Sequence, residues 1–288
     1  MKIAILGSRG QLGRDLCQRL SREALPLTRT DLDLADPAQV HALLASHKPD
    51  LFINCAAYNF VDRAEAEPEL AFAVNALGPR TLARACADAG VRLVHFSTDY
   101  VFGLDRDRDR ATPYHESDAP GPVSVYGQSK LAGEGFVLAA SPANLVIRTC
   151  GLYGVWGSGG KGGNFVETML RIAGAGKPLH VVADQHCTPS STADVALATK
   201  SLIENEVYGL VHVVNDGSCS WHGFAAEIFR QASVAANLTA IPSQEFPQPA
   251  RRPRYSVLST AKLASAGISM RPWQEALAAY LKERLLKA

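Results

Sequence analysis

Residues 2–13, KIAILGSRGQLG, join an apolar segment to a glycine-rich turn that opens a stretch of helical character. Glycine permits a tight turn, and the free N–H groups at a helix N-terminus attract anions such as a pyrophosphate. The spacing is GxxGxxG, which differs from the GxGxxG dinucleotide-binding fingerprint, and any strand-to-helix turn favours glycine. Its place at the first strand and first helix nevertheless supports cofactor binding. The candidate cofactor-binding residues of this turn are Gly7, Gly10, Gln11, Leu12 and Gly13.

Short apolar runs alternate with helical stretches through the first half of the chain. The expected strands are 2–6, 25–28, 50–57, 91–97 and 144–149, and the expected helices are 11–21, 37–47, 68–89 and 126–139. Near-continuous hydrophobicity is typical of parallel strands covered on both faces. Pro37 and Pro68 stand near helix starts, where proline is well tolerated. The alternation predicts an α/β fold, a Rossmann-type doubly wound parallel sheet.

The alternation loosens after residue 150, which suggests a second part of the chain. A glycine-rich segment lies at 153–164, and a segment with four prolines lies at 242–256, where regular structure cannot continue for long. A last helix is expected over 272–286. We therefore expect a dinucleotide-binding domain at 1–150 and a smaller, mixed α/β substrate-binding lobe at 151–288, with segments around 190–215 rejoining the first domain.

The composition excludes several classes of protein. Hydrophobic residues make up 47% and charged residues 20%, and the net charge is +1, so nothing suggests a nucleic-acid partner. The run DRDRDR at 105–110 alternates in sign and is expected to be a solvated loop. No apolar run is long enough for a membrane span or a signal peptide. Six cysteines without a CxxC pair or a His/Cys cluster argue against a metal site and for a reducing compartment, so we expect a cytoplasmic protein.

The second expected strand indicates which nicotinamide cofactor would bind. Sites that prefer NAD usually place an acid at the end of this strand, but here it ends LTRTD, with Arg29 before the first acid. Arg9 lies in the glycine turn, and two guanidinium groups would suit the 2′-phosphate of NADPH, although either could be an ordinary surface arginine. NADPH is therefore favoured and NADH stays possible. Asp33 and Leu34 are expected to meet the adenine.

Three residues whose side chains could take part in catalysis occur one after another along the chain. The expected strand 91–97 leads directly to Thr98, at the edge of the sheet where ligands of such folds bind, and Tyr126 and Lys130 follow four apart in a helix. A neighbouring ammonium is expected to lower the pKa of a tyrosine, which could then exchange a proton with a substrate oxygen while Thr98 hydrogen-bonds the same atom. This order resembles the Ser/Thr…YxxxK pattern of short-chain dehydrogenases/reductases.

A wider set of motifs extends the resemblance over nearly the whole chain. The motifs are INCAAYNFVDRAEAEPELAFAVNA, FSTDYVF, PYHESD, VYGQSKLAGE, GGNFVETML, ADQHCTP and ARRPRYSVLST. Together they resemble the dTDP-4-dehydrorhamnose reductases, extended short-chain reductases. The resemblance implies that a nucleotide sugar, dTDP-4-dehydro-6-deoxy-L-mannose, is reduced at its 4-keto group with NADPH or NADH to dTDP-L-rhamnose.

Carried over by position, the resemblance assigns roles to particular residues. Thr98, Tyr126 and Lys130 would be catalytic, and the last two would also contact the cofactor. Further cofactor-binding residues would be Ala56, Ala57 and Tyr58. The substrate-binding residues would be Val61, Asp62, Thr98, Asp99, Tyr100, Asn164, Phe165 and Arg252. Several have an ordinary alternative, because Val61 and Phe165 could be core residues, Asp62 and Asn164 turn residues, and Arg252 a surface cation.

One departure from the family concerns the sugar. The family often reads SWLYG after RT, with a tryptophan that packs on the sugar, whereas this chain reads RTCGLYG and has Gly151 at that place. Trp156 could replace the missing ring or could only cover the interface between the lobes. The identity of the keto-sugar is therefore less certain than the class of reaction.

Two other functions remain as alternatives. Sugar-nucleotide dehydratases carry Thr-Asp-Glu at the end of the catalytic strand, but this chain has Tyr100 in place of the glutamate, which favours simple reduction. The regulatory subunit of methionine adenosyltransferase resembles the same family and binds a dinucleotide without catalysis. The presence of Thr98, Tyr126 and Lys130 argues against that role. A homodimer is possible, although no apolar stripe indicates one.

Overall fold

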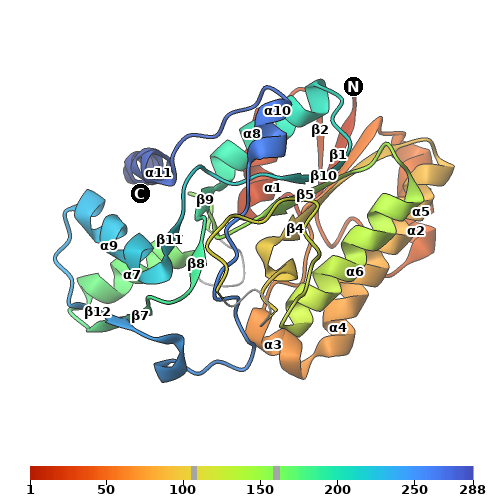
Figure 1. Ribbon diagram of the computed structural model, residues 1–288. Coiled ribbons are helices and arrows are strands. Elements are labelled where there is room, and N and C mark those ends of the chain that lie inside the picture. Colours follow the sequence, from red (N-terminus) through yellow and green to blue (C-terminus); the bar gives the residue numbers. More distant parts are fainter. Residues whose placement is uncertain (105–108, 158–162, 288) are drawn as a thin grey trace.

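A six-stranded sheet forms the centre of the computed structural model, which describes residues 1–104, 109–157 and 163–287 (Figure 1). The strand order is β10-β5-β4-β3-β1-β2, and every neighbouring pair is parallel. The strands are β1 (Ile3–Leu6), β2 (Ala24–Leu27), β3 (Leu51–Asn54), β4 (Arg92–Thr98), β5 (Leu145–Thr149) and β10 (Gly209–His212). The chain adds β2 on one side of β1 and β3 on the other, so the order in which strands are added reverses between β1 and β3. Ligands of doubly wound folds bind at such a point.

Helices cover both faces of this sheet and divide its core in two. Side chains of alternate strand residues, such as Ile5 and Ile53, pack with helices α1 (Gln11–Arg19) and α8 (Thr192–Glu204). Their neighbours point to the other face, as strand residues do, and pack against three further helices. These are α2 (Pro37–His47), α5 (Gly78–Asp88) and α6 (Val125–Ala140). The predicted doubly wound parallel sheet is therefore confirmed.

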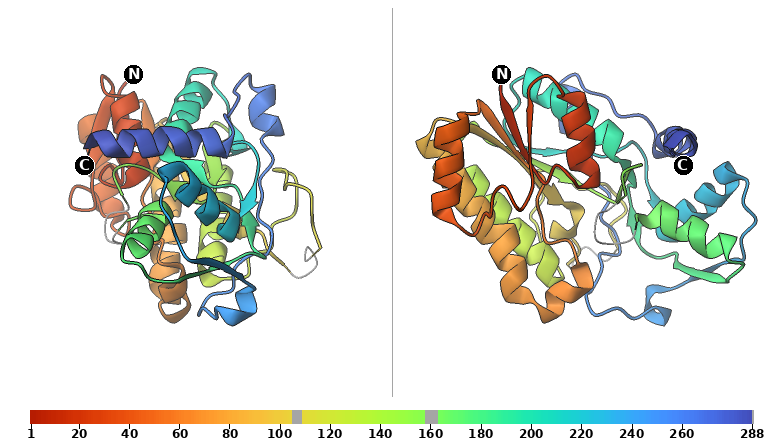
Figure 2. Two further views of the ribbon diagram at one scale, coloured as in Figure 1. Left: turned by 90° about the vertical axis from the view of Figure 1, so that its left-hand side faces the viewer. Right: turned by 180° about the vertical axis from the view of Figure 1, so that it is seen from behind.

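A smaller body lies beside the sheet, at the left of Figure 1. Its core contains aromatic residues such as Tyr153, Phe224 and Trp273. Its helices are α7 (Phe165–Gly174), α9 (Trp221–Ala232) and α11 (Trp273–Lys287), and Figure 2 shows α11 running across this body. Its paired strands are β7 (Leu179–Val182) with β12 (Leu238–Ile241), β8 (His186–Cys187) with β11 (Cys219–Ser220), and β6 (Leu152–Tyr153) with β9 (Ser190–Ser191). The lobe boundary at residue 150 stays a prediction. In the segment around 190–215, β10 is a strand of the central sheet and α8 packs on one of its faces.

The long helix expected over 68–89 is interrupted. It consists of α4 (Pro68–Phe72), a π-helical turn η1 (Ala73–Leu77) and α5, and α3 (Val61–Ala66) precedes it. A π-turn inserts an extra residue into the helix and is frequent at functional sites. Periodicity did not predict it, because both segments keep an apolar face.

The remaining segments are short. They are the 3₁₀ turns η2 (Asp99–Val101) and η4 (Ser243–Glu245) and the helix α10 (Ala261–Ser265). The expected loop DRDRDR and glycine-rich segment lie partly outside the described residues. No helix in the part of the chain that the structure describes has the length and apolar character needed to cross a membrane. The same residues contain no cluster of His, Cys, Asp and Glu suited to a metal ion.

Candidate active site

The glycine turn is packed so closely that it has no room for side chains. Gly7 has a φ of +82°, and a Cβ added there would lie 2.9 Å from the backbone nitrogen of Ala56, in the segment after β3. A Cβ at Gly13 would lie 2.2 Å from the carbonyl oxygen of Gly7. Gly10 is the N-cap of α1 and provides no side-chain cap. The first turn of α1 therefore presents backbone N–H groups at the reversal point of the sheet, as an anionic group requires.

Two other predicted residues of the turn have different environments. The side chain of Leu12 is buried in the core against the sheet, so only its backbone could meet a ligand. Gln11 donates from Nε2 to the carbonyl oxygen of Leu152 at 3.1 Å. Its Oε1 is buried without a hydrogen-bond partner among the described residues. A buried acceptor in this position would be satisfied by a donor from a bound ligand.

The predicted adenine and nicotinamide contacts lie around the same edge. Asp33 is half-buried and its Oδ1 accepts from the backbone nitrogen of Ala35 at 3.0 Å, whereas the side chain of Leu34 is buried in the core. Ala56 and Ala57 follow β3 directly. Tyr58 is mostly buried and donates its hydroxyl to Glu67. None of these contacts identifies a ligand, so the roles stay predictions.

The two candidate arginines for a 2′-phosphate differ in position. Arg9 lines a cavity of about 590 Å³ together with Arg14, Thr28 and Asp31. Arg29 is exposed and is not among its lining residues. The carboxylate of Asp31 accepts hydrogen bonds from the nitrogen and the hydroxyl of Thr28, at 2.8 and 2.6 Å. These bonds, aided by the charge of Arg9, lower the pKa of Asp31. This acid and Arg9 therefore share one cavity, which the sequence analysis did not foresee.

The catalytic candidates meet where β4 faces α6. Ser124 begins α6 as its N-cap, because its hydroxyl accepts from the backbone nitrogen of Gly127 at 3.2 Å. Tyr126 follows in the first turn, close enough to Thr98 at the end of β4 for that side chain to act on its pKa. The Nζ of Lys130, one turn further, donates to the carbonyl oxygen of Phe96 at 2.6 Å. The fold thus brings together the three residues that the sequence pattern singles out.

The pKa of Tyr126 differs from the expectation. We expected Lys130 to lower it, but burial raises the pKa of Tyr126 to about 12, although the side chain of Thr98 acts in the opposite direction. The ammonium of Lys130 is directed to a backbone carbonyl, and its own pKa is lowered to about 8 by burial. The expected effect on Tyr126 is therefore wrong for this arrangement. Near neutral pH, Tyr126 is a protonated phenol and Lys130 is mainly an ammonium.

Asp99, next to Thr98, faces the interior. Its carboxylate accepts from Ser256 Oγ at 2.6 Å, from Cys150 Sγ at 3.1 Å and from Thr98 Oγ1 at 3.1 Å. Burial raises the pKa of Asp99, and these hydrogen bonds partly offset the rise. The carboxylate therefore holds Thr98 from behind, and a contact between Asp99 and a substrate stays a prediction.

Three predicted substrate residues form a chain of contacts that ends at Tyr126, the candidate catalytic tyrosine. Asp62 forms a bidentate ion pair with Arg252, at 2.6 and 2.7 Å, across 190 residues of sequence. The charge of Arg252 also acts on Tyr100, where it opposes the rise that burial causes in the pKa of this phenol. The ring of Tyr100 packs edge-on against that of Tyr126, with centroids 5.7 Å apart. Val61 is the first residue of α3, beside Asp62.

Asn164 and Phe165 have contacts within the smaller body. Asn164 caps α7 by accepting from the backbone nitrogen of Glu167 at 3.1 Å, and it donates to the carbonyl oxygen of Gly154 at 3.1 Å. The ring of Phe165 lies 4.8 Å from that of Trp221 and stacks on Phe224 at 5.5 Å. These contacts agree with the ordinary alternatives, a turn residue and a core residue. Binding roles for both stay predictions.

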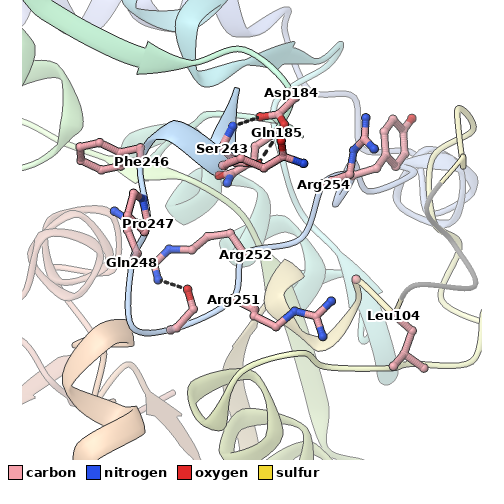
Figure 3. A pocket seen from close by; sticks show the side chains of 14 residues that line it. Leu104, Asp184, Gln185, Ser243, Phe246, Pro247, Gln248, Arg251, Arg252 and Arg254 are labelled. Atoms are coloured by element: carbon pink, nitrogen blue, oxygen red, sulfur yellow. Dashed lines mark hydrogen bonds between the residues drawn. The ribbon is translucent and has the colours of Figure 1, made fainter. Parts of the chain in front are cut away.

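A second cavity adjoins the Asp62–Arg252 pair. It measures about 370 Å³ and is shown in Figure 3. Arg251, Arg252 and Arg254, from the proline-rich segment after η4, lie around it with Gln185 and Gln248. Three guanidinium groups at one cavity suit an anionic group such as a diphosphate.

The contacts of Trp156 distinguish between its two expected roles, which were to replace the ring missing at Gly151 or to cover the interface between the lobes. Trp156 donates from Nε1 to Asp15 Oδ1 at 2.8 Å, and the guanidinium of Arg14 lies 5.4 Å from its ring centroid. Trp156 therefore packs on α1, which agrees with a role at the interface between the two bodies. The ring near Gly151 belongs to Trp221, which would lie 3.5 Å from a Cβ at that position.

Asn75 is a site residue that sequence reasoning missed. It lies in the π-turn η1, is almost fully buried, and clamps Tyr58 by accepting from its backbone nitrogen at 2.8 Å and donating to its carbonyl oxygen at 2.9 Å. Its Nδ2 also donates to Ser129 Oγ at 3.0 Å, and Ser129 Oγ donates to the carbonyl oxygen of Tyr126 at 2.8 Å. Asn75 thus joins the segment after β3 to the catalytic helix. An asparagine between apolar residues, in AVNAL, was the available signal.

Comparisons with known proteins agree with this geometry. The family model of the RmlD substrate binding domain matches residues 1–286. The dTDP-4-dehydrorhamnose reductase of Mycolicibacterium smegmatis is 42% identical over 283 residues, which are 96% of this chain and 84% of that protein. A crystal structure of a dTDP-4-dehydrorhamnose reductase from Clostridium acetobutylicum has a TM-score of 0.91 and 40% identity, with all of both chains covered. The corresponding Bacillus anthracis protein, in complex with NADP, has a TM-score of 0.91 and 38% identity, over 98% of this chain and 100% of that one. The chain therefore belongs to the dTDP-4-dehydrorhamnose reductase family.

Proposed function

We propose that this protein reduces the 4-keto group of a nucleotide-linked deoxysugar, converting dTDP-4-dehydro-6-deoxy-L-mannose to dTDP-L-rhamnose. The observation that carries the proposal is the meeting of Thr98 and Tyr126 at the carboxyl edge of the sheet, with Lys130 one helical turn away. Relatives that carry the name of this activity support it.

The residues at the glycine turn fit a dinucleotide cofactor. A Cβ would collide with backbone at Gly7 and Gly13, the N-terminus of α1 has no side-chain cap, and Gln11 Oε1 is an unsatisfied acceptor among the described residues. NADPH, when bound, supplies the hydride. Arg9 supports NADPH, and Asp31 in the same cavity supports acceptance of NADH as well. The NADP complex of the B. anthracis relative agrees with this choice.

The chain's own residues supply the proton and stabilise developing charge. The raised pKa keeps the hydroxyl of Tyr126 protonated near neutral pH, so it can donate its proton to the substrate oxygen as negative charge forms there. Thr98 has one hydroxyl hydrogen, which it donates to Asp99 in this structure, so it would turn this hydrogen to the substrate oxygen to act as a second donor there. Lys130 adds a buried positive charge one turn away.

The three arginines of the proline-rich segment support a substrate with a diphosphate. Arg252 already forms a bidentate bond with a carboxylate, the geometry in which arginine also binds phosphate. Its charge acts on Tyr100, whose ring packs against Tyr126, so that end of the substrate would lie near the catalytic tyrosine.

The test is an assay of NADPH oxidation with enzymatically prepared dTDP-4-dehydro-6-deoxy-L-mannose, beside a sugar-free control and an NADH arm. The Tyr126→Phe variant should bind NADPH normally and lose about 10²- to 10⁴-fold in kcat. Tyr153→Phe is the matched control, because its buried hydroxyl has no hydrogen-bond partner in the described ranges. NADPH binding without turnover in the unmodified protein would support a non-catalytic binding role, and full turnover by Tyr126→Phe would refute the proton-donor assignment.

We also propose a cellular compartment, a domain division and an oligomeric state. All six cysteines are free thiols, which supports a reducing compartment such as the cytoplasm. The division into a cofactor domain and a substrate lobe near residue 150 and a homodimeric state are also proposed. Limited proteolysis and sedimentation would test these two proposals.

A further inference from the structure

The catalytic helix carries a third buried ionisable residue beyond Tyr126 and Lys130. Glu134 lies four residues after Lys130 and therefore on the same face of α6. Lys130 and Glu134 are each only 2% exposed. Both meet consecutive residues of β4, because Lys130 donates to the carbonyl oxygen of Phe96 and Glu134 accepts from the hydroxyl of Ser97. Strand and helix are therefore joined by hydrogen bonds at two successive strand residues, directly before Thr98.

A bidentate ion pair holds the carboxylate of Glu134. Arg148, in β5, donates from Nε to Oε1 at 2.9 Å and from Nη2 to Oε2 at 2.7 Å, and both side chains are 3% exposed. The guanidinium lies 5.0 Å from the ring centroid of Phe102, and its Nη1 is 3.4 Å from His212 Nε2. Burial lowers the pKa of His212 to about 3, so this imidazole is neutral. Burying a carboxylate without such partners costs free energy. The hydrogen bonds from Arg148 and Ser97 hold the Glu134 side chain in one position.

The other titratable neighbours of Lys130 carry no charge near neutral pH. Burial raises the pKa of the Cys55 thiol, after β3, and that of Tyr126 on α6. Burial, with the charge of Lys130, lowers the pKa of His95 in β4 well below its usual value. Burial lowers the pKa of Lys130 itself to about 8, and Glu134 is the largest influence in the opposite direction. Arg148, on β5, is the charged group behind Glu134.

We propose that Glu134, fixed by Arg148 and Ser97, is a positioning residue of the active site that keeps the buried Lys130 in its ammonium form and holds α6 in register with Thr98. The inference rests on the role proposed for Lys130. Glu134 acts only through Lys130 and the helix, so it needs no contact with the substrate or the cofactor.

The direct test follows the titration of Lys130 by NMR in cofactor-free protein with labelled lysine, where the signal is assigned by its loss in Lys130→Met. Glu134→Gln should lower the midpoint by about one pH unit, a tenfold change in acidity, because a neutral amide cannot stabilise the ammonium. Asp194→Asn is the matched control. Asp194 also forms a bidentate pair with an arginine, Arg271, with both bonds at 2.8 Å, but it lies on α8. It should leave the midpoint unchanged.

A second variant covers the case in which Glu134→Gln does not fold. The double variant Glu134→Leu with Arg148→Met replaces the pair by apolar side chains, an exchange that proteins often tolerate. It should lower the Lys130 midpoint in the same direction. An unchanged midpoint in either folded variant, whatever its melting temperature, would overturn the proposal and leave Glu134 a purely structural residue.

The rate assay separates this inference from the proposed function. If the unmodified protein oxidises NADPH with the keto-sugar, the pH profile of kcat should shift in Glu134→Gln in parallel with the NMR midpoint. If the unmodified protein shows no turnover, the reductase proposal fails, while the titration of Lys130 still decides the role of Glu134.

Discussion

The glycine turn and the face between β4 and α6 lie at the same edge of the sheet, yet they are built in opposite ways. At Gly7 and Gly13 the missing side chains let backbone approach backbone, and an added Cβ would lie 2.9 and 2.2 Å from backbone atoms. Between β4 and α6, buried polar side chains such as Lys130 fill the space and satisfy one another. The turn should therefore be sensitive to any added atom, and the catalytic face to changes of charge.

The largest effect is expected at the glycine turn. Gly13→Ala should reduce NADPH affinity by about 100-fold or more and lower the melting temperature, because backbone must move to admit the methyl group. Gly135→Ala is the control, because nothing lies within 4 Å of a Cβ there and alanine favours the helix. It should stabilise the protein slightly. If the two variants had the same NADPH affinity and the same melting temperature, the glycine turn would not be especially sensitive to an added atom.

The catalytic face should show the reverse, a gain of stability when a functional charge is removed. The folded-state pKa of Lys130, about 8, is below its ordinary value of 10.5, so the folded protein binds fewer protons between these values. The burial penalty is full below pH 8 and disappears as the pH approaches 10.5. Lys130→Met should be more stable than the unmodified protein by about 2 kcal/mol at pH 7, and inactive.

Thermal melts at pH 7 and pH 10 provide the check on Lys130. The stability difference between the variant and the unmodified protein should shrink at the higher pH, because the lysine is then neutral in the folded state. If this stability difference were the same at both pH values, packing and not charge would explain the stability of Lys130→Met. Sensitivity to charge would then not distinguish the face between β4 and α6 from the glycine turn.

A moderate effect is expected where the proline-rich segment meets α3. Arg252→Lys keeps the charge but loses the bidentate geometry toward Asp62 and toward a phosphate. It should raise the KM for the nucleotide sugar roughly tenfold, with a smaller change in kcat. Arg254→Lys, in the same cavity, serves as the comparison and should change KM less. Equal KM values would show that charge alone matters there.

The smallest effect concerns the choice of cofactor. Arg9 and Asp31 share an exposed cavity, where charges are screened and single contacts are weak. Arg9→Ala should weaken NADPH about threefold and leave NADH nearly unchanged, whereas Asp31→Asn should weaken NADH by a similar factor. Titrations with both cofactors measure the ratio. If Asp31→Asn weakens both cofactors equally, the hydrogen bonds from Thr28 hold the turn and do not select the ribose.

Much of the fold could be predicted because its signals are local. The parallel strands and the helix starts at Pro37 and Pro68 follow from apolar runs and from proline, which act over a few residues. The order of Thr98, Tyr126 and Lys130 was also visible, since each follows a recognisable strand end or helix. The π-turn around Asn75 was missed, because an extra residue in a helix leaves the apolar pattern almost intact.

The sequence by itself determined the doubly wound sheet, the glycine turn and the order of the candidate catalytic residues Thr98, Tyr126 and Lys130, because these depend on neighbours along the chain. Only the tertiary structure decided the pairing of Asp62 with Arg252, the position of Trp156 on α1 and the network around Glu134. It also reversed the expected pKa shift of Tyr126, since burial raises this pKa and Lys130 is not among the groups that act on it. Burial and long-range charge pairing depend on which segments meet in space, and local patterns do not contain that information.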